Sequence, residues 1–139
     1  MDEENEQMNG TTVNETAQNT VDNYRYICTM DDNTFEEKRA IVNACNNALS
    51  LNGIGDTPLI VVGAYIVSGV RSKTGQKCAN VYLFANDGKT YFSQSQGIYR
   101  SVLDIYDMFP DFNAPDGIPV AVKQTPLGGG RSTKLLVIK

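Results

Sequence analysis

This chain contains no histidine. The side chains left to carry a function are therefore mainly aromatic and basic. Histidine is the commonest general base and the commonest metal ligand. The three cysteines, Cys28, Cys45 and Cys78, lack CxxC spacing and are too scattered for a zinc site, so they indicate free buried thiols in a reducing compartment. Neither a phosphate-binding loop nor a nucleophile elbow is present. The sequence therefore argues against an enzyme and predicts no metal and no other cofactor.

Aromatic residues on predicted strands, with basic residues at neighbouring turns, are typical of proteins that bind single-stranded nucleic acid. Positive charge holds the phosphates, and exposed rings stack on bases for roughly 1–3 kcal/mol per base. Two alternatives stay open. In one, Phe84 packs beneath a helix at 33–48 and does not contact DNA. In the other, the exposed ring after the NDGK turn is Phe92 and not Tyr91. The predicted DNA-binding residues are Arg71, Lys73, Lys77, Tyr82, Phe84, Lys89, Tyr91, Lys123, Arg131 and Lys134.

The alternation of apolar and polar residues predicts the elements that must position these side chains. Strands are expected at 57–70, 78–85, 90–95, 118–125 and 134–139, and a helix at 97–109 between the third and fourth strands. Three meandering strands, a helix and a hairpin form the element order of the OB-fold barrel. The predicted fold is therefore mainly β with two helices (α+β), an OB-fold five-stranded β-barrel with an extra N-terminal strand and helix.

The extra elements precede this barrel. Residues 24–30 alternate like a strand, and Thr34 with Glu37 forms the T-x-x-E capping box of a helix that is expected to end near Ala48. In the long strand at 57–70, Gly63 and Gly69 are positions where the chain can bend or bulge. On the following strand, Val81, Leu83 and Ala85 are expected to point into the barrel. Tyr82 is expected to point outward.

Charge divides the chain into an acidic arm and a basic body. Residues 1–37 hold ten acidic residues and one basic residue, whereas residues 38–139 hold six acidic and eleven basic, which together give the net charge of −4. We expect residues 1–22 to be a disordered acidic and polar arm, and residues 23–139 to be a single OB-fold-like DNA-binding domain. The arm is either an interaction tail or a solvated tag. No apolar run approaches the roughly 18–20 residues of a membrane span, and MDEENEQ is no secretory signal, so we expect a cytoplasmic protein without membrane contact.

Several local features resemble the single-stranded DNA-binding proteins of phages and mobile elements of Gram-positive bacteria. The shared features are the Asn46-Asn47 pair that ends a helix, the Asp87-Gly88 turn, Tyr91 and Ser93 before the Gly97-Ile98 helix start, and Lys123-Gln124 after the fourth strand. The resemblance covers residues 26–139. It implies an OB-like protein without enzymatic activity that coats single-stranded DNA in replication, recombination or transfer inside the bacterial host. It also implies replication or recombination proteins as partners, and the mild charge favours a homo-oligomer or cooperative array.

A different class of function stays open. In that alternative the chain is an OB-type protein-interaction or virion structural module, the aromatic face is a subunit interface, and the acidic arm is a hook for a partner. A reader of duplex DNA is disfavoured, because neither predicted helix is basic enough for the major groove.

Overall fold

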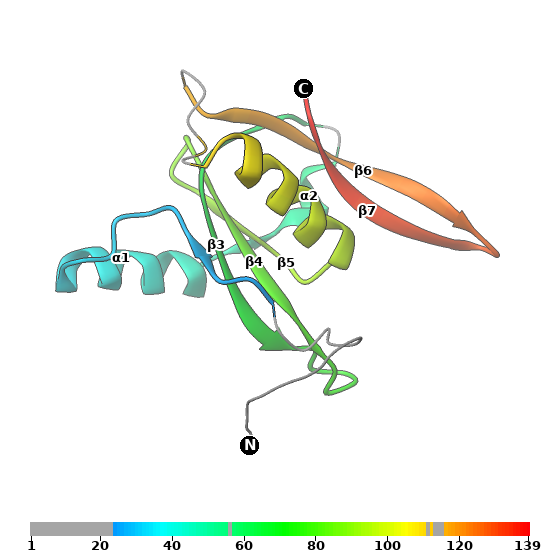
Figure 1. Ribbon diagram of the computed structural model, residues 1–139, viewed down its shortest axis with the longest axis horizontal. Coiled ribbons are helices and arrows are strands. Elements are labelled where there is room, and N and C mark those ends of the chain that lie inside the picture. The colour runs from blue at the N-terminus through cyan, green and yellow to red at the C-terminus, as the bar shows by residue number, and fades with distance from the viewer. Residues whose placement is uncertain (1–23, 56, 111, 113–115) are drawn as a thin grey trace.

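The computed structural model of the protein describes residues 24–55, 57–110, 112 and 116–139 (Figure 1). The arm expected at 1–22 lies outside the described residues. Among these described residues, two helices and a short 3-10 turn (η2) accompany seven strands. The elements in chain order are β1 (Ile27–Cys28), α1 (Phe35–Asn46), β2 (Leu49–Ser50), η2 (Leu51–Ile54), β3 (Leu59–Val70), β4 (Lys77–Ala85), β5 (Thr90–Ser93), α2 (Gln96–Met108), β6 (Ile118–Gly128) and β7 (Arg131–Ile138).

The strands form one curled mixed sheet, a half-barrel. Its order is β2-β5-β4-β3-β6-β7, with β1 paired to β3 off this path. All pairs are antiparallel except β2 with β5, which are parallel. Among the described residues no ladder joins β7 to β5 or β2, and α2 packs against β7 in that region (Figure 1). The prediction of a mainly β fold with two helices is confirmed.

The long strand β3 belongs to both halves of the curled sheet. Its first residues, from Leu59 to Val61, pair with β6, and its remainder pairs with β4. The register with β4 shifts between Val61 and Gly63, so the predicted irregularity at this glycine is confirmed. Gly63 also lies close to Met30: a β-carbon there would overlap its sulfur, so a side chain at this position would require Met30 to move. The bend in β3 therefore lies at a glycine that also leaves room for the Met30 side chain.

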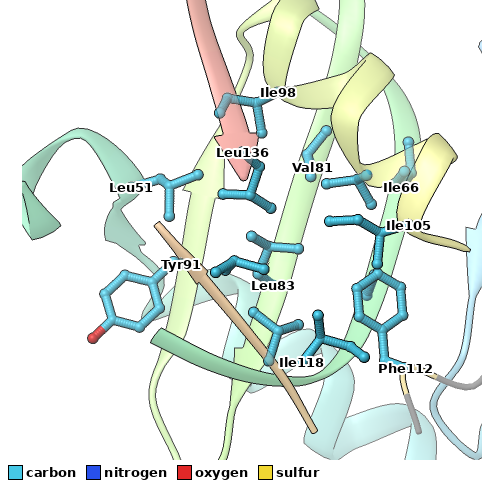
Figure 2. Packing of buried hydrophobic residues seen from close by; sticks show 14 of the residues in the cluster. Leu51, Ile66, Val81, Leu83, Tyr91, Ile98, Ile105, Phe112, Ile118 and Leu136 are labelled. Carbon is cyan, nitrogen blue, oxygen red and sulfur yellow. The ribbon is translucent and has the colours of Figure 1, made fainter. Parts of the chain in front are cut away.

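The core lies on the inner side of the curled sheet, beneath α2. Figure 2 shows Val81 and Leu83 of β4 packed with Ile98 and Ile105 of α2 and with Leu136 of β7. Val81 and Leu83 have no exposed surface, and Ala85 is also buried. The predicted inward face of this strand is therefore confirmed. Because α2 and β7 contribute to the same cluster, helix packing helps to bury the side of the half-barrel that lacks a ladder.

The N-terminal strand and α1 differ from expectation in extent. The expected strand at 24–30 shortens to Ile27–Cys28, because β1 pairs with β3 only at Ile66 and Tyr65. The capping box of α1 is present, with Thr34 Oγ1 accepting from the Glu37 amide at 3.1 Å and Glu37 Oε1 accepting from the Thr34 amide at 3.0 Å. However, α1 ends at Asn46, and none of its residues is buried. This helix therefore lies at the periphery of the molecule.

Candidate nucleic-acid interface

Four aromatic rings follow one another across the outer face of the sheet, and we call them the aromatic row: Tyr26, Tyr65, Tyr82 and Phe92. Tyr65 pairs with Tyr82 between β3 and β4, and Tyr82 pairs with Phe92 between β4 and β5. Their ring centroids are 5.9 Å and 5.1 Å apart, and Tyr26 meets Tyr65 edge-on at 6.0 Å. Residues directly opposite one another on paired strands project from the same face, so the pairing itself builds the row.

The rings of the aromatic row are accessible and neutral. Tyr65, Tyr82 and Phe92 are half-buried, whereas 61% of the Tyr26 surface is exposed. Burial raises the pKa of the Tyr65 and Tyr82 phenols above the ordinary value, chiefly because the phenolate would lose solvation, with a smaller contribution from Cys45. The row therefore carries no negative charge at neutral pH that would repel a phosphate.

An amide pair lies beside the aromatic row, one step further along β4 and β5. Gln94 Nε2 donates to Asn80 Oδ1 at 2.8 Å and to the Val70 carbonyl oxygen at 3.3 Å. The Asn80 side chain occupies the space above Gly69, where a β-carbon would overlap it. Asn80 Nδ2 and Gln94 Oε1 make no hydrogen bond with another described residue. One donor group and one acceptor therefore stand next to rings on which a base can stack.

A basic cleft opens where the aromatic row ends at Phe92. It has a volume of about 480 Å³ and brings Arg71, from the end of β3, together with Lys134 of β7. Arg71 Nη2 donates to the Gln94 carbonyl oxygen at 2.9 Å, which holds the guanidinium at the cleft. The other lining residues are Asn52, Phe92, Ser93, Gln94, Ser95, Gln96, Ser132 and Thr133. Two of the predicted DNA-binding cations thus line one cleft beside the half-buried ring of Phe92.

The remaining predicted cations are exposed but do not line this cleft. Lys73 and Lys77 belong to the turn and strand start that follow β3, and Lys123 and Arg131 belong to the protruding β6–β7 hairpin (Figure 1). Lys89 lies at the β4–β5 turn, where it lines a separate apolar groove beside α1. The structure therefore divides the predicted basic residues among four places: the basic cleft, the β3–β4 turn, the β6–β7 hairpin and the β4–β5 turn.

Two predicted aromatic residues lie elsewhere. Tyr91 is 9% exposed and belongs to the hydrophobic core, because the alternation along β5 sends its ring inward. Phe92 supplies the outward ring, so the candidate surface contains Phe92 instead of Tyr91. Phe84 is buried and lines the apolar groove with Ala40 and Ile41 of α1. Phe84 therefore shares a groove with that helix, and the surface loses it as a stacking ring.

Sequence reasoning missed Tyr26, Tyr65, Asn80 and Gln94 as members of this surface. Tyr65 lies within a long strand that has apolar residues on both faces, so periodicity could not identify the outer face of that strand. Tyr26 lies in a stretch that alternates like a strand. Its position next to Ile27, an apolar residue suited to the core, was the signal that could have placed Tyr26 on the outer face. Asn80 and Gln94 become neighbours only through the register of β4 with β5.

No known family model, curated protein or solved structure matches the chain. In the part of the chain that the structure describes, no helix is long and apolar enough to cross a membrane. The same residues contain no group of three or more His, Cys, Asp or Glu side chains arranged to hold a metal ion. Function is therefore inferred from the aromatic row and the basic cleft.

Proposed function

We propose that this protein binds single-stranded DNA with little sequence preference, without enzymatic activity, and coats it during replication, recombination or transfer of phage or mobile-element DNA. The aromatic row is the observation that carries this proposal. Three of its rings are aligned by strand register, and the row ends at a cleft that holds Arg71 and Lys134. Rings for bases and cations for phosphates are the two requirements of sequence-tolerant binding.

The spacing of the rings favours single strands over duplex. Neighbouring centroids lie 5.1 to 6.0 Å apart, whereas stacked bases in duplex DNA rise by about 3.4 Å. One base per ring therefore requires an extended strand whose bases are no longer stacked on each other. In a duplex the faces of the bases are covered by their neighbours, so the row has nothing on which to stack.

The topology supports an OB-fold origin for this surface. The order β3, β4, β5, α2, β6 and β7 matches three meandering strands, a helix and a hairpin. OB folds bind oligonucleotides on the face of their second and third strands, with the first and last hairpin loops on either side. Here those strands correspond to β4 and β5, which carry Tyr82 and Phe92. We therefore also propose kinship with the single-stranded DNA-binding proteins of Gram-positive phages and mobile elements.

A second candidate function, a protein-interaction or virion structural module, is favoured by α1. Phe35 and Val42 of this helix are 71% and 56% exposed, and none of its residues is buried. Exposed apolar residues gathered on one element are typical of contact surfaces. In this candidate function, the aromatic row is covered by another subunit and does not stack on bases.

Fluorescence anisotropy of the full chain with labelled oligo(dT), over a salt series, tests the first proposal. Tyr82→Ala should weaken binding by about 1–3 kcal/mol, the contribution of one stacked base. Phe35→Ala is the matched control, because it removes an exposed ring that lies outside the row, and it should leave affinity unchanged. Absence of binding at low salt, or equal affinity for a duplex of the same length, contradicts the proposal.

Light scattering after size-exclusion chromatography separates the two candidate functions. For a DNA-binding row, Tyr82→Ala should lose affinity for oligo(dT) while the molar mass stays that of the unmodified protein. If Tyr82→Ala instead dissociates an oligomer and leaves affinity per protomer unchanged, the row is a subunit interface.

A further inference from the structure

The basic cleft holds two cations and no carboxylate. Its lining contains Arg71 and Lys134 but neither aspartate nor glutamate. Within the described residues, the ion pairs are Arg25 with Asp107 and Arg39 with Glu36, so neither cleft cation takes part in one. Both side chains are half-buried. The cleft therefore concentrates unbalanced positive charge on a chain whose net charge is −4.

Attraction between opposite charges grows as partial burial reduces solvent screening. An oxyanion in this cleft meets two cations and no competing carboxylate. It also makes charge-assisted hydrogen bonds, which are about twice as strong as those between neutral groups.

The neutral lining residues suit an oxyanion with several oxygens. Ser132 and Thr133 bring hydroxyl groups, and Asn52 and Gln96 bring side-chain amides. Arg71 presents a planar guanidinium that matches phosphate geometry. The carbonyl oxygen of Gln94 already fixes one of its nitrogens, so less side-chain freedom is lost when an anion binds.

We propose that the basic cleft is a discrete binding site for one phosphate group, held by Arg71 and Lys134. The proposal that the phosphate belongs to a DNA strand rests on the proposed function, since the cleft shares Phe92 with the aromatic row. In that arrangement a base stacks on Phe92 while its adjoining phosphate enters the cleft. A backbone phosphodiester and free inorganic phosphate share the chemistry that the cleft recognises.

Inorganic phosphate alone tests the site without DNA. In amide-detected NMR spectra of the full chain, phosphate should produce saturable shifts at residues 94–96 and 132–134. The Arg71→Gln and Lys134→Gln variants should each weaken this binding at least tenfold, and Lys38→Gln, which removes an exposed lysine of α1 outside the cleft, should not change it. Shifts that do not saturate, or that are equal at Lys73, Lys89 and Lys123, overturn the proposal.

The salt dependence of oligo(dT) binding tests the backbone phosphodiester as the source. For single strands the slope of log K against log salt concentration changes by about 0.7 for each phosphate contact. Lys134→Gln should therefore reduce the slope by about this amount, and Lys134→Arg should restore it. The conservative variant guards against an indirect effect of altered folding. An unchanged slope in Lys134→Gln overturns the assignment to backbone phosphate.

Failure of the cleft and failure of the proposed function give different results. Saturable phosphate binding in a protein that does not bind oligo(dT) keeps the anion site and rejects DNA binding. Oligo(dT) binding that depends on Tyr82, combined with no phosphate saturation and an unchanged slope in Lys134→Gln, keeps the function and rejects the cleft. A thymine oligomer with a neutral methylphosphonate backbone provides a further test. Because this backbone carries no phosphate charge, the affinity of the protein for it should not respond to Arg71→Gln.

Discussion

Gly97 at the start of α2 lies against the carbonyl oxygen of Lys134 in β7, so closely that a β-carbon at position 97 would overlap that oxygen. One turn later, the Ser101 hydroxyl donates to the Gly97 carbonyl oxygen at 2.8 Å and accepts from the Leu136 amide at 3.0 Å. These contacts join α2 to β7 on the side of the half-barrel where no ladder is formed between described strands. They also fix the position of Lys134 at the basic cleft.

Gly97→Ala should therefore lower the free energy of unfolding by about 1–3 kcal/mol, the usual cost of forcing extra atoms into a packed contact. Chemical denaturation measured by circular dichroism provides the value. Gly53→Ala is the control, because no atom lies within 4 Å of a β-carbon at that position. Equal stability of the two variants would show that α2 and β7 separate easily.

Tyr91 and Phe92 are neighbours in sequence with opposite expected roles. Tyr91→Ala should lower the free energy of unfolding by about 3–5 kcal/mol, because it removes a core aromatic ring. Phe92→Ala should instead weaken oligo(dT) binding by about 1–3 kcal/mol through lost stacking. Denaturation and anisotropy measured on both variants check this contrast. Strong binding by a stable Phe92→Ala variant would remove this ring from the proposed interface.

The acidic arm should compete with DNA for the basic body. The described chain begins beside the β3–β4 hairpin, where the Tyr24 hydroxyl donates to the Lys77 carbonyl oxygen at 3.4 Å. Deleting residues 1–22 should raise affinity for oligo(dT) at low salt, and the gain should shrink at high salt because screening weakens the competition. A variant of equal length with the arm's acids changed to amides should behave like the deletion. Unchanged affinity in both variants would exclude competition.

Alkaline pH should destabilise the fold through Tyr65 and Tyr82. Burial raises the pKa of both phenols, so the folded state holds their protons more tightly than the unfolded state does. Their contribution to stability is complete below the ordinary tyrosine pKa of about 10 and is lost as pH rises through the higher folded values. Urea denaturation from pH 8 to 11 should show this decline. The double variant Tyr65→Phe/Tyr82→Phe should flatten it, and an equally steep decline would assign the effect to other groups.

The meander, both helices and the inward face of β4 were predictable because their patterns are local. Thr34 and Glu37 satisfy each other's backbone amides within one turn, so their spacing alone predicts the start of α1. Val81 and Leu83 alternate with Tyr82, which fixes their side of the sheet. The packing of α1 was not predictable in this way. The contacts available to a helix depend on where the distant strands lie, and residues far from the helix in the sequence decide that.

The composition of the candidate site depends on register, which local patterns fix only in part. A shift of one residue moves every side chain to the opposite face. Both residues of the Tyr91-Phe92 pair are aromatic, so hydrophobicity could not decide which ring points outward. The presence of Arg71 and Lys134 in one cleft depends on how β7 packs against α2. That packing is a tertiary relationship without a signature in either segment.

The ring spacing of the aromatic row has a mechanical consequence for any strand that follows it. A strand with one base on each ring advances 5.1 to 6.0 Å per base, whereas a stacked strand advances about 3.4 Å. Binding would therefore lengthen the DNA between its ends. Pulling on that DNA performs part of the same extension, so a stretched strand would be bound more tightly than a slack one.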